Sequence, residues 1–456
     1  MDSKAYMQKL IEQSRKAQEH FAAFSQKQID TVVRGIGKAL YDNAEALSRL
    51  AVEETGMGKY EDKILKNKNK SKITWYKLAG KKSRGVIRHI PELGLIEIAH
   101  PMGVVGAITP TTNPTMTPMH NAMIALKGGN SMIVCPHPRA KKVGMETVSV
   151  INQAIAKLGA PQNLIQVIPE PTLELSQLTM KLCDVCISTG GASVVAAAYS
   201  SGKPAFGVGQ GNVQVLVDQD ADFKEMAAKV TMGRAYDLGI LCTCEQSVIC
   251  PEGSYDAIIA LFKEQGAYYV ESPEEVHAVR ELLFPDGVFN KNTVGIEAVA
   301  LAETAGIKVP ANTRILMVKV SEVGQAEPLS REKLCPVLCV YSYKTWEQAV
   351  DIAYSNLKFE GIGHSATVHS KTPMHVEYAA VRLPVSRIAV NQPAAGSLGG
   401  MLNNGLNPTG TLGCGSWGNN SLSENLWYTH LINISRVAYI IPDINIPSDE
   451  EIWATE

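Results

Sequence analysis

Residues 104–135 read VVGAITPTTNPTMTPMHNAMIALKGGNSMIVC, and this stretch sets the pattern for the first half of the chain. Two short apolar runs, 104–109 and 131–135, flank a helical pattern around residues 119–126. Parallel strands need a long crossover connection, which is usually a helix, so the stretch predicts a parallel βαβ unit.

The same alternation extends on both sides of this unit. The further strand-like runs are 164–168, 184–188, 213–217, 247–250 and 336–343, and the helical patterns are 143–158, 173–180, 255–265 and 346–355. The sequence therefore predicts an α/β protein with parallel sheets and helices on both faces. Ligands of such sheets lie beyond the carboxyl ends of the strands, so we expect binding residues in the loops at 109–115, 136–139 and 189–192.

The two ends of the chain follow other patterns. Residues 1–80 carry apolar side chains at three-to-four spacing and predict helices, with the lysine-rich run 66–70 as a solvated helix face. Residues 85–100 read as two strands around a Pro/Gly turn, and 435–446 as one more strand-like segment. A hairpin with so little core of its own predicts an arm that reaches another copy of the chain.

Composition excludes several classes of partner. A chain of 456 residues predicts two to three domains, and its net charge of -2 gives no reason to expect nucleic acid. No apolar run reaches the roughly 18 residues that span a bilayer, so no membrane partner is expected. Nine cysteines without framework spacing indicate reduced thiols and a cytoplasmic protein. Cys183 and Cys186 lie in an apolar run and are interpreted as packing residues rather than a redox pair or zinc ligands.

One cysteine stands out as a candidate nucleophile. The stretch 234–246, RAYDLGILCTCEQ, places Cys242 just past a Gly-containing turn and at the edge of an apolar run. Backbone N–H groups in such a turn lower the pKa of a thiol and favour the reactive thiolate. The alternative is that Cys242, Cys244 and Cys250 are all buried apolar filler, as most free cysteines are.

The usual nucleotide and metal fingerprints are missing. No Gly-x-Gly-x-x-Gly follows the first strand, and neither a P-loop nor His-Glu-x-x-His occurs. The motif Gly207-x-Gly209-x-Gly211 precedes a strand and predicts a turn. A dinucleotide, if one is bound, is held in some other way, and no metal site is expected.

A set of short motifs, modest singly, carries a resemblance that covers nearly the whole chain. They are TPTTNPT at 109–115, ALKGGN at 125–130, PHPR at 136–139, STGG at 188–191, GVGQGN at 207–212, the Cys242 stretch, EKLCP at 332–336, GIGHS at 361–365 and TLGCGSWG at 411–418. In this order they resemble the aldehyde dehydrogenase superfamily in its coenzyme A-acylating branch. Within the branch the chain is most similar to the coenzyme A-dependent succinate semialdehyde dehydrogenases, through KSKITWY at 70–76 and IPSDEEIW at 446–453.

The resemblance implies an architecture and a set of partners. Residues 1–82 and 102–238 would form a Rossmann-type cofactor domain, 239–430 an α/β catalytic domain, and 83–101 with 431–456 a small β oligomerisation arm. The partners implied are a small aldehyde, coenzyme A as co-substrate, NADP or NAD, and further copies of the chain in a dimer or a dimer of dimers.

The resemblance also implies roles for individual residues. Cys242 would attack the aldehyde, and the acyl group of the resulting thioester would pass to coenzyme A. Cys244 is expected to be packing. Glu332 would hold the nicotinamide ribose; without the resemblance it would be read as a surface glutamate. The other cofactor-binding residues implied are Thr109, Pro110, Thr111, Thr112, His137, Arg139, Gly190, Gly191 and Gly209.

Two assignments stay open between alternatives. The oxyanion donor is either Asn113, which carries an amide, or Thr112, which the alignment of Pro110 and Pro114 favours. We take Asn113, with the Cys242 backbone N–H as a second donor. His364 is either a proton carrier or a structural hydrogen-bonding residue.

Departures from the hydrolytic members of the family favour acyl transfer and NADP. Val208 stands where those members carry the glutamate that activates water, and a thiol needs less help than water. Cations at 139–142, with no carboxylate left to repel a 2′-phosphate, favour NADP over NAD, although they would also suit a solvated helix start.

The substrate assignment rests on cations near the thiol. A semialdehyde of a dicarboxylic acid needs a cation for its far carboxylate, and Arg234 with Arg387 behind it are the candidates; Thr243 is added beside the thiol. Either arginine would equally serve as a structural ion-pair partner. The rival hypotheses are acetaldehyde or another short aliphatic aldehyde, hydrolytic oxidation to the free acid, and a non-catalytic nucleotide-binding scaffold.

Overall fold

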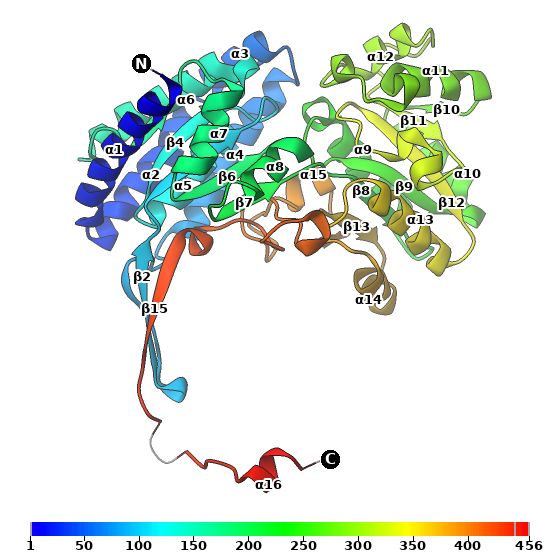
Figure 1. Ribbon diagram of the computed structural model, residues 1–456. Helices are drawn as coiled ribbons and strands as arrows, with labels where there is room; N and C mark the ends of the chain where they lie inside the picture. The colour runs from blue at the N-terminus through cyan, green and yellow to red at the C-terminus, as the bar shows by residue number, and fades with distance from the viewer. Residues whose placement is uncertain (1, 442–443, 455–456) are drawn as a thin grey trace.

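The computed structural model describes residues 2–441 and 444–454, and it shows two α/β lobes and a projecting arm (Figure 1). The first lobe lies in the blue-to-green part of the chain, and the second in the green-to-yellow part. Each lobe contains its own parallel sheet, so the predicted α/β class with parallel sheets is confirmed.

The first lobe is built on a five-stranded sheet in the order β5-β4-β3-β6-β7, with every neighbouring pair parallel. Its strands are β3 (Val104–Thr109), β4 (Ser131–Pro136), β5 (Ile165–Val167), β6 (Val185–Thr189) and β7 (Ala205–Val208). Its helices are α1 (Ser3–Ala22), α2 (Gln26–Asp42), α3 (Ala44–Thr55), α4 (Tyr60–Leu78), α5 (Met116–Lys127), α6 (Lys141–Ala156), α7 (Leu173–Leu182) and α8 (Ala192–Tyr199). The predicted βαβ unit is β3-α5-β4, and α5 is buried along its whole length because α2, α4 and α6 pack around it.

The second lobe carries a seven-stranded parallel sheet in the order β10-β11-β12-β9-β8-β13-β14. Its strands are β8 (Val213–Val217), β9 (Glu245–Pro251), β10 (Ala267–Val270), β11 (Ile315–Lys319), β12 (Val337–Tyr343), β13 (Ala366–His369) and β14 (Ile388–Val390). Its helices are α9 (Phe223–Ala235), α10 (Tyr255–Glu264), α11 (Pro273–Leu283), α12 (Ala298–Thr304), α13 (Trp346–Phe359), α14 (Pro373–Arg382) and α15 (Ala394–Ser397).

The change from one sheet to the other falls earlier than the predicted boundary at 238. β7 closes the first sheet, and β8 pairs with β9 and β13 in the second, so the chain crosses between residues 208 and 213. The sequence placed β8 with the first lobe because nothing in an apolar run says which sheet receives it. A segment near the C-terminus returns to the first lobe, where Leu426, Trp427 and Leu431 pack in the core.

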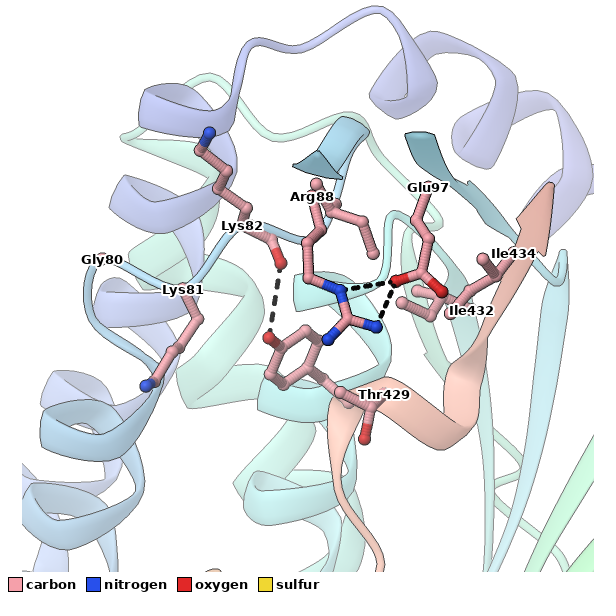
Figure 2. A pocket seen from close by; sticks show the side chains of 10 residues that line it. Gly80, Lys81, Lys82, Arg88, Glu97, Thr429, Ile432 and Ile434 are labelled. Atoms are coloured by element: carbon pink, nitrogen blue, oxygen red, sulfur yellow. Dashed lines mark hydrogen bonds and ion pairs between the residues drawn. The ribbon is translucent and has the colours of Figure 1, made fainter. Parts of the chain in front are cut away.

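The arm is an antiparallel sheet of β1 (Gly85–Ile90), β2 (Leu95–Pro101) and β15 (Ile432–Ala438), in the order β1-β2-β15. It extends away from both lobes and leads to the short helix α16 (Asp449–Ile452), which lies far from the body (Figure 1). Large apolar side chains stay in solvent here: Ile440 is 94% exposed and Trp453 is 80% exposed. A cavity of about 410 Å³ lies at the base of the arm. There Arg88 binds the Glu97 carboxylate, and the Lys82 carbonyl accepts from Tyr428 (Figure 2).

None of the described helices is long and apolar enough to cross a membrane.

Asn130 fastens the arm to the first lobe. Its Oδ1 accepts from the backbone N–H groups of Met102, at 2.7 Å, and Gly103, at 2.9 Å. Its Nδ2 donates to the carbonyls of Ala125, at 2.9 Å, and Leu431, at 2.8 Å. One fully buried amide therefore satisfies four backbone groups where β2, α5 and β15 meet.

We expect Asn130→Ala to destabilise the protein by at least about 3 kcal/mol, because four buried backbone groups lose their partner. The measurement is the midpoint of thermal unfolding, which should fall by roughly 5 °C or more. Asn69→Ala, on the exposed face of α4, is the matched control and should stay close to wild type. Equal midpoints for the two variants would contradict this role of Asn130.

Candidate active site

The Cys242 side chain lies where the two sheets meet. It is in a turn just before β9, and it is partly exposed, whereas every other cysteine is buried. Its apolar surroundings come from both lobes: Val208 ends β7 of the first sheet, and Val213 and Ala389 belong to the second. The remaining neighbours in this cluster are Ala394, Leu398, Leu412 and Cys414. Cys242 is thus the least buried of the cysteines, and its sulfur is surrounded by carbon and sulfur.

Gly211 holds the neighbouring loop against the nucleophile. A Cβ at this position would lie 1.9 Å from the carbonyl oxygen of Cys242, so no other residue fits without moving the backbone. The Gly211 N–H donates to Oε1 of Glu332 at 3.0 Å. Glu332 itself is only 6% exposed. The glutamate that the family resemblance singles out is therefore buried beside the thiol and not on the surface.

The surroundings of Cys242 keep its sulfur protonated. Burial raises the pKa of Cys242, the negative charge of Glu332 raises it further, and Arg387 opposes both. The expectation that a turn of N–H groups lowers this pKa is wrong, because desolvation outweighs the turn. Burial, with the Glu360 carboxylate nearby, raises the pKa of Glu332 itself to about 8.

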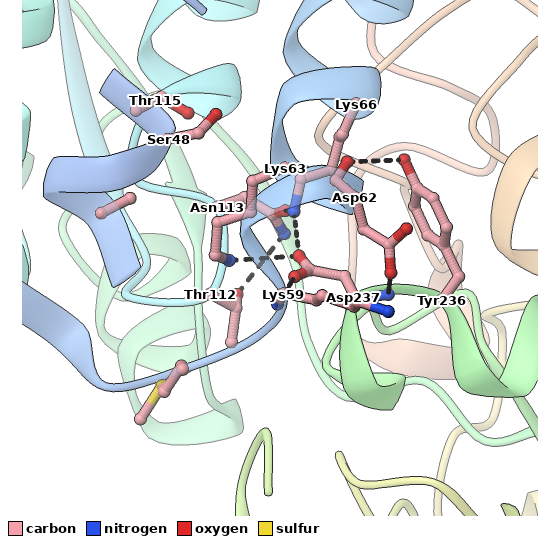
Figure 3. Close-up of polar contacts among 12 residues, drawn as sticks. Ser48, Lys59, Asp62, Lys63, Lys66, Thr112, Asn113, Thr115, Tyr236 and Asp237 are labelled. Atoms are coloured by element: carbon pink, nitrogen blue, oxygen red, sulfur yellow. Dashed lines mark hydrogen bonds and ion pairs between the residues drawn. The ribbon is translucent and has the colours of Figure 1, made fainter. Parts of the chain in front are cut away.

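Two lysines of α4 meet one buried carboxylate directly before the nucleophile (Figure 3). Oδ2 of Asp237, which is fully buried, accepts from Lys63 Nζ at 3.1 Å and from Lys66 Nζ at 2.5 Å. Its Oδ1 accepts from the backbone N–H of Lys59 at 2.8 Å. The prediction of a solvated lysine face is wrong for Lys66, which is 7% exposed, because the carboxylate that buries it lies 171 positions away in the sequence.

Lys66 also fixes the orientation of Asn113. Its Nζ donates to Asn113 Oδ1 at 2.6 Å, and an ammonium group can only donate, so the amide oxygen must face the lysine. Asn113 Nδ2 then points away from Lys66, with only a 3.5 Å contact to Thr112 Oγ1 (Figure 3). A nearly free amide N–H is what an oxyanion requires, which favours Asn113 over Thr112.

His364 lies just before β13, and Arg387 lies just before β14. Both ring nitrogens of the fully buried His364 lack a hydrogen-bond partner among the described residues. Burial lowers its pKa to about 3, so the imidazole is neutral at physiological pH. Arg387 donates to the carbonyls of His364 and Gly413, and the sulfurs of Cys414 and Cys242 lie close enough to raise its pKa against the effect of burial.

Arg234 is not placed to bind a substrate. Its side chain is fully buried, and its guanidinium donates to the carbonyls of Glu245, at 2.9 Å, and Cys335. It therefore ties α9 to β9 and to the segment before β12. Thr243 is 5% exposed and its hydroxyl donates to the Ala395 carbonyl at 3.3 Å. Cys244 is fully buried, as predicted.

The residues expected to bind the cofactor gather at one edge of the first sheet. Thr109 ends β3 and leads to Pro110, Thr111 and Thr112, while His137 and Arg139 are exposed just beyond β4. Gly190 and Gly191 follow β6, and Gly209 follows β7. No atom beyond its neighbours lies within 4 Å of a Cβ built on Gly191 or Gly209. This edge has the room and the loop ends that a dinucleotide needs.

Carboxylates do reach the cationic end of this edge, contrary to the expectation from the local sequence. Glu54 of α3 accepts from the backbone N–H groups of Lys142, at 2.9 Å, and Val143, at 2.7 Å, and so caps α6. Glu170 pairs with Lys141 at 2.5 Å. The local sequence could not show them, because both carboxylates come from other elements.

Comparison with known proteins places the chain among relatives. The model of the aldehyde dehydrogenase family matches residues 1–278. The succinate-semialdehyde dehydrogenase (acetylating) of Clostridium kluyveri is 49% identical over 453 residues, covering 99% of this chain and 100% of that protein.

Solved structures agree with this relationship. An acetylating aldehyde dehydrogenase from Geobacillus thermoglucosidasius is 36% identical with a TM-score of 0.93, covering 98% of each chain. A propionaldehyde dehydrogenase from Rhodopseudomonas palustris, solved with bound CoA and an acylated cysteine, is 29% identical with a TM-score of 0.85, covering 95% of this chain and 97% of that one.

We expect Glu332→Gln to shift the alkylation of Cys242 by iodoacetamide to lower pH, since a negative neighbour disfavours the thiolate. The difference should be confined to pH values above about 8, where Glu332 is ionised; below them the carboxyl is neutral in both proteins. The measurement is the alkylation rate against pH, after subtraction of the rate for Cys242→Ser. Glu264→Gln, exposed on α10, is the matched control. An unchanged profile or an upward shift for Glu332→Gln would contradict the assignment.

Proposed function

The chain belongs to the aldehyde dehydrogenase family, and on that premise we propose that it is a coenzyme A-acylating enzyme that works through Cys242. The overall reaction converts an aldehyde, coenzyme A and NAD(P)⁺ reversibly to acyl-coenzyme A, NAD(P)H and a proton. The observation that carries the proposal is the partly exposed Cys242 at the junction of the two sheets, in an apolar shell with Val208 where the hydrolytic enzymes place a base.

The protein residues act in a set order. Cys242 Sγ, once deprotonated, bonds to the aldehyde carbon, and the carbonyl oxygen takes up negative charge. Asn113 Nδ2 and the Cys242 backbone N–H stabilise that oxyanion, at a typical value of about 3 kcal/mol per donor. A bound nicotinamide would accept the hydride from the carbon that Cys242 holds, which leaves a thioester on Cys242, and Glu332 would orient the nicotinamide ribose. The thiol of coenzyme A then attacks the Cys242 thioester, and Cys242 leaves as thiolate.

Acyl transfer to a thiol, and not to water, follows from the chemistry around the thioester. Val208 is 1% exposed and cannot deprotonate water. The Glu332 carboxylate is engaged by the Gly211 N–H. The neutral His364 has two unpartnered ring nitrogens, one of which can accept a hydrogen bond from the incoming thiol, but a pKa of about 3 makes it a weak base, so the thiol proton goes to solvent and not to the imidazole.

The favoured aldehyde is succinic semialdehyde. The relative from Clostridium kluyveri supports it at 49% identity over 99% of this chain. Acetaldehyde or another short aliphatic aldehyde is the alternative, and it would need no cation in the pocket.

The favoured cofactor is NADP, with NAD as the alternative. Arg139 and the exposed Lys142 supply positive charge beyond β4. Glu54 works against this preference, because its carboxylate occupies the N-terminus of α6 where a 2′-phosphate would gain from backbone N–H groups. A higher kcat/KM with NADPH than with NADH would support NADP.

The arm and the thiols support a homo-oligomer in a reducing compartment. The apolar side chains at the end of the arm have no cover within the described chain, and a second copy would supply it. All nine cysteines are free, and a catalytic thiol must stay reduced, which supports the cytoplasm.

We expect NADPH formation from succinic semialdehyde, NADP⁺ and coenzyme A, followed by absorbance, to fall by at least about a thousandfold in Cys242→Ser. Cys250→Ala, in the buried strand β9, is the control and should remain active. An undiminished rate without coenzyme A would establish hydrolytic oxidation. An unaffected Cys242→Ser variant would establish a non-catalytic role.

The oligomer prediction uses the exposed end of the arm. Wild type should sediment at two or four times the chain mass of 49.3 kDa, and the double variant Ile440→Asp/Trp453→Asp should shift towards the monomer. Leu173→Asp, which alters an exposed apolar residue of the body, is the control. A monomeric wild type would refute the assignment of the arm.

A further inference from the structure

The inner face of α4 holds more positive charge than its contacts neutralise. Asp237 is the one fully buried carboxylate that Lys63 and Lys66 share. Lys70, one turn further, donates to the Gly399 carbonyl at 2.8 Å and forms no ion pair with any described residue. The Lys70 side chain is half-buried, so its unneutralised ammonium carries part of the cost of desolvation, and an anion at this place would offset it.

The geometry of α4 places two of these ammonium groups side by side. Residues four apart on a helix face the same way, with Cβ atoms about 6 Å apart, so Lys66 and Lys70 are neighbours. Each ammonium has three N–H donors. Lys66 uses two, on Asn113 and Asp237, and Lys70 uses one, on Gly399. Three donors on adjacent turns are left for a ligand.

A third polar group on the same stripe also lacks a partner. Thr74, four residues beyond Lys70, is fully buried, and its Oγ1 has no hydrogen-bond partner among the described residues. Buried hydroxyl groups nearly always have one, so the unpaired Thr74 points to a ligand or an ordered water at this face.

This face borders the reacting centre on two sides. Lys66 contacts Asn113, whose amide is assigned to the oxyanion. Lys70 contacts Gly399, and the adjacent Leu398 packs in the cluster around Cys242. Both contacts connect this face of α4 with the residues around Cys242.

We propose that Lys66 and Lys70 bind the far carboxylate of the aldehyde substrate and so select semialdehydes of dicarboxylic acids over neutral aldehydes. This inference rests on the proposed function. It replaces Arg234, whose guanidinium is fully buried and donates to the carbonyls of Glu245 and Cys335, as the carboxylate partner. Arg387 donates to the carbonyls of His364 and Gly413 and to the Ser365 hydroxyl, and its Nε has no partner among the described residues, so the variants below, and not a count of free donors, separate the α4 lysines from Arg387.

The first experiment compares kcat/KM for succinic semialdehyde and for butanal, a neutral aldehyde of the same chain length, each with coenzyme A and NADP⁺. The ratio of the two values should fall at least about tenfold in Lys70→Met, because the variant loses a charge contact that only the semialdehyde makes. Lys66→Met should lower the ratio too, with an added fall for both aldehydes because Asn113 loses its support. Lys72→Met, exposed on the same helix, should leave the ratio unchanged.

The second experiment needs no turnover. Succinate should raise the thermal midpoint of wild type and protect Cys242 from iodoacetamide, and it should do neither in Lys70→Met. Methionine keeps the length and apolar stem of lysine, so the variant is expected to fold, and its unliganded midpoint checks this.

The outcomes separate the two proposals. Absence of coenzyme A-dependent turnover with either aldehyde overturns the proposed function, while succinate binding that needs Lys70 would still support the lysine site. An equal fall in kcat/KM for both aldehydes in Lys70→Met, or succinate binding that the substitution leaves unaffected, overturns the carboxylate site. The lysines would then have a structural role around an ordered water.

Discussion

The ion pairs of the buried Asp237 carboxylate hold the site together. They join α4 to the turn that delivers the nucleophile, and Lys66 passes the constraint on to the amide of Asn113. That turn is costly on its own, since Asp237 and Leu238 have φ angles of 48° and 54°, a region that side chains disfavour. Even Gly58 serves this carboxylate, because a Cβ there would lie 2.1 Å from its Oδ1. Breaking these pairs would strand buried charges and release the turn.

The thiol and its surroundings follow one electrostatic logic. Burial keeps Cys242 protonated at neutral pH, and the charge of Glu332 adds to this above about pH 8, which limits unwanted alkylation and oxidation of the sulfur. Catalysis then needs a change of environment, and a positively charged nicotinamide ring beside the sulfur would provide it. The apolar shell that raises the pKa also excludes a water-activating base, so Val208 belongs to the same arrangement as the thiol. The protonated resting state of the thiol and the preference for acyl transfer over hydrolysis thus have the same cause, the apolar shell around Cys242.

The sheets explain why this site can form. Both are parallel, and the crossing between β7 and β8 places the end of one beside the start of the other. Gly211 lies in that crossing and contacts the nucleophile through its backbone. One short connection therefore brings the cofactor edge of the first lobe to the thiol of the second. The relatives with TM-scores of 0.93 and 0.85 share this fold over nearly their whole length.

The sequence by itself determined the α/β class, most strands and the candidate nucleophile, because alternating apolar runs and a thiol in a turn are local features. The cations proposed to meet the substrate, and the carboxylates at the edge proposed to bind the cofactor, were decided only by tertiary structure. Arg234 and Lys66 look alike in the sequence as charged residues on helices. In the structure Arg234 donates to buried backbone carbonyls, whereas Lys66 donates to the side chain of Asn113. Glu54 approaches α6 from 88 positions away. Charge pairing across such separations depends on which helices pack together, and no local pattern carries that information.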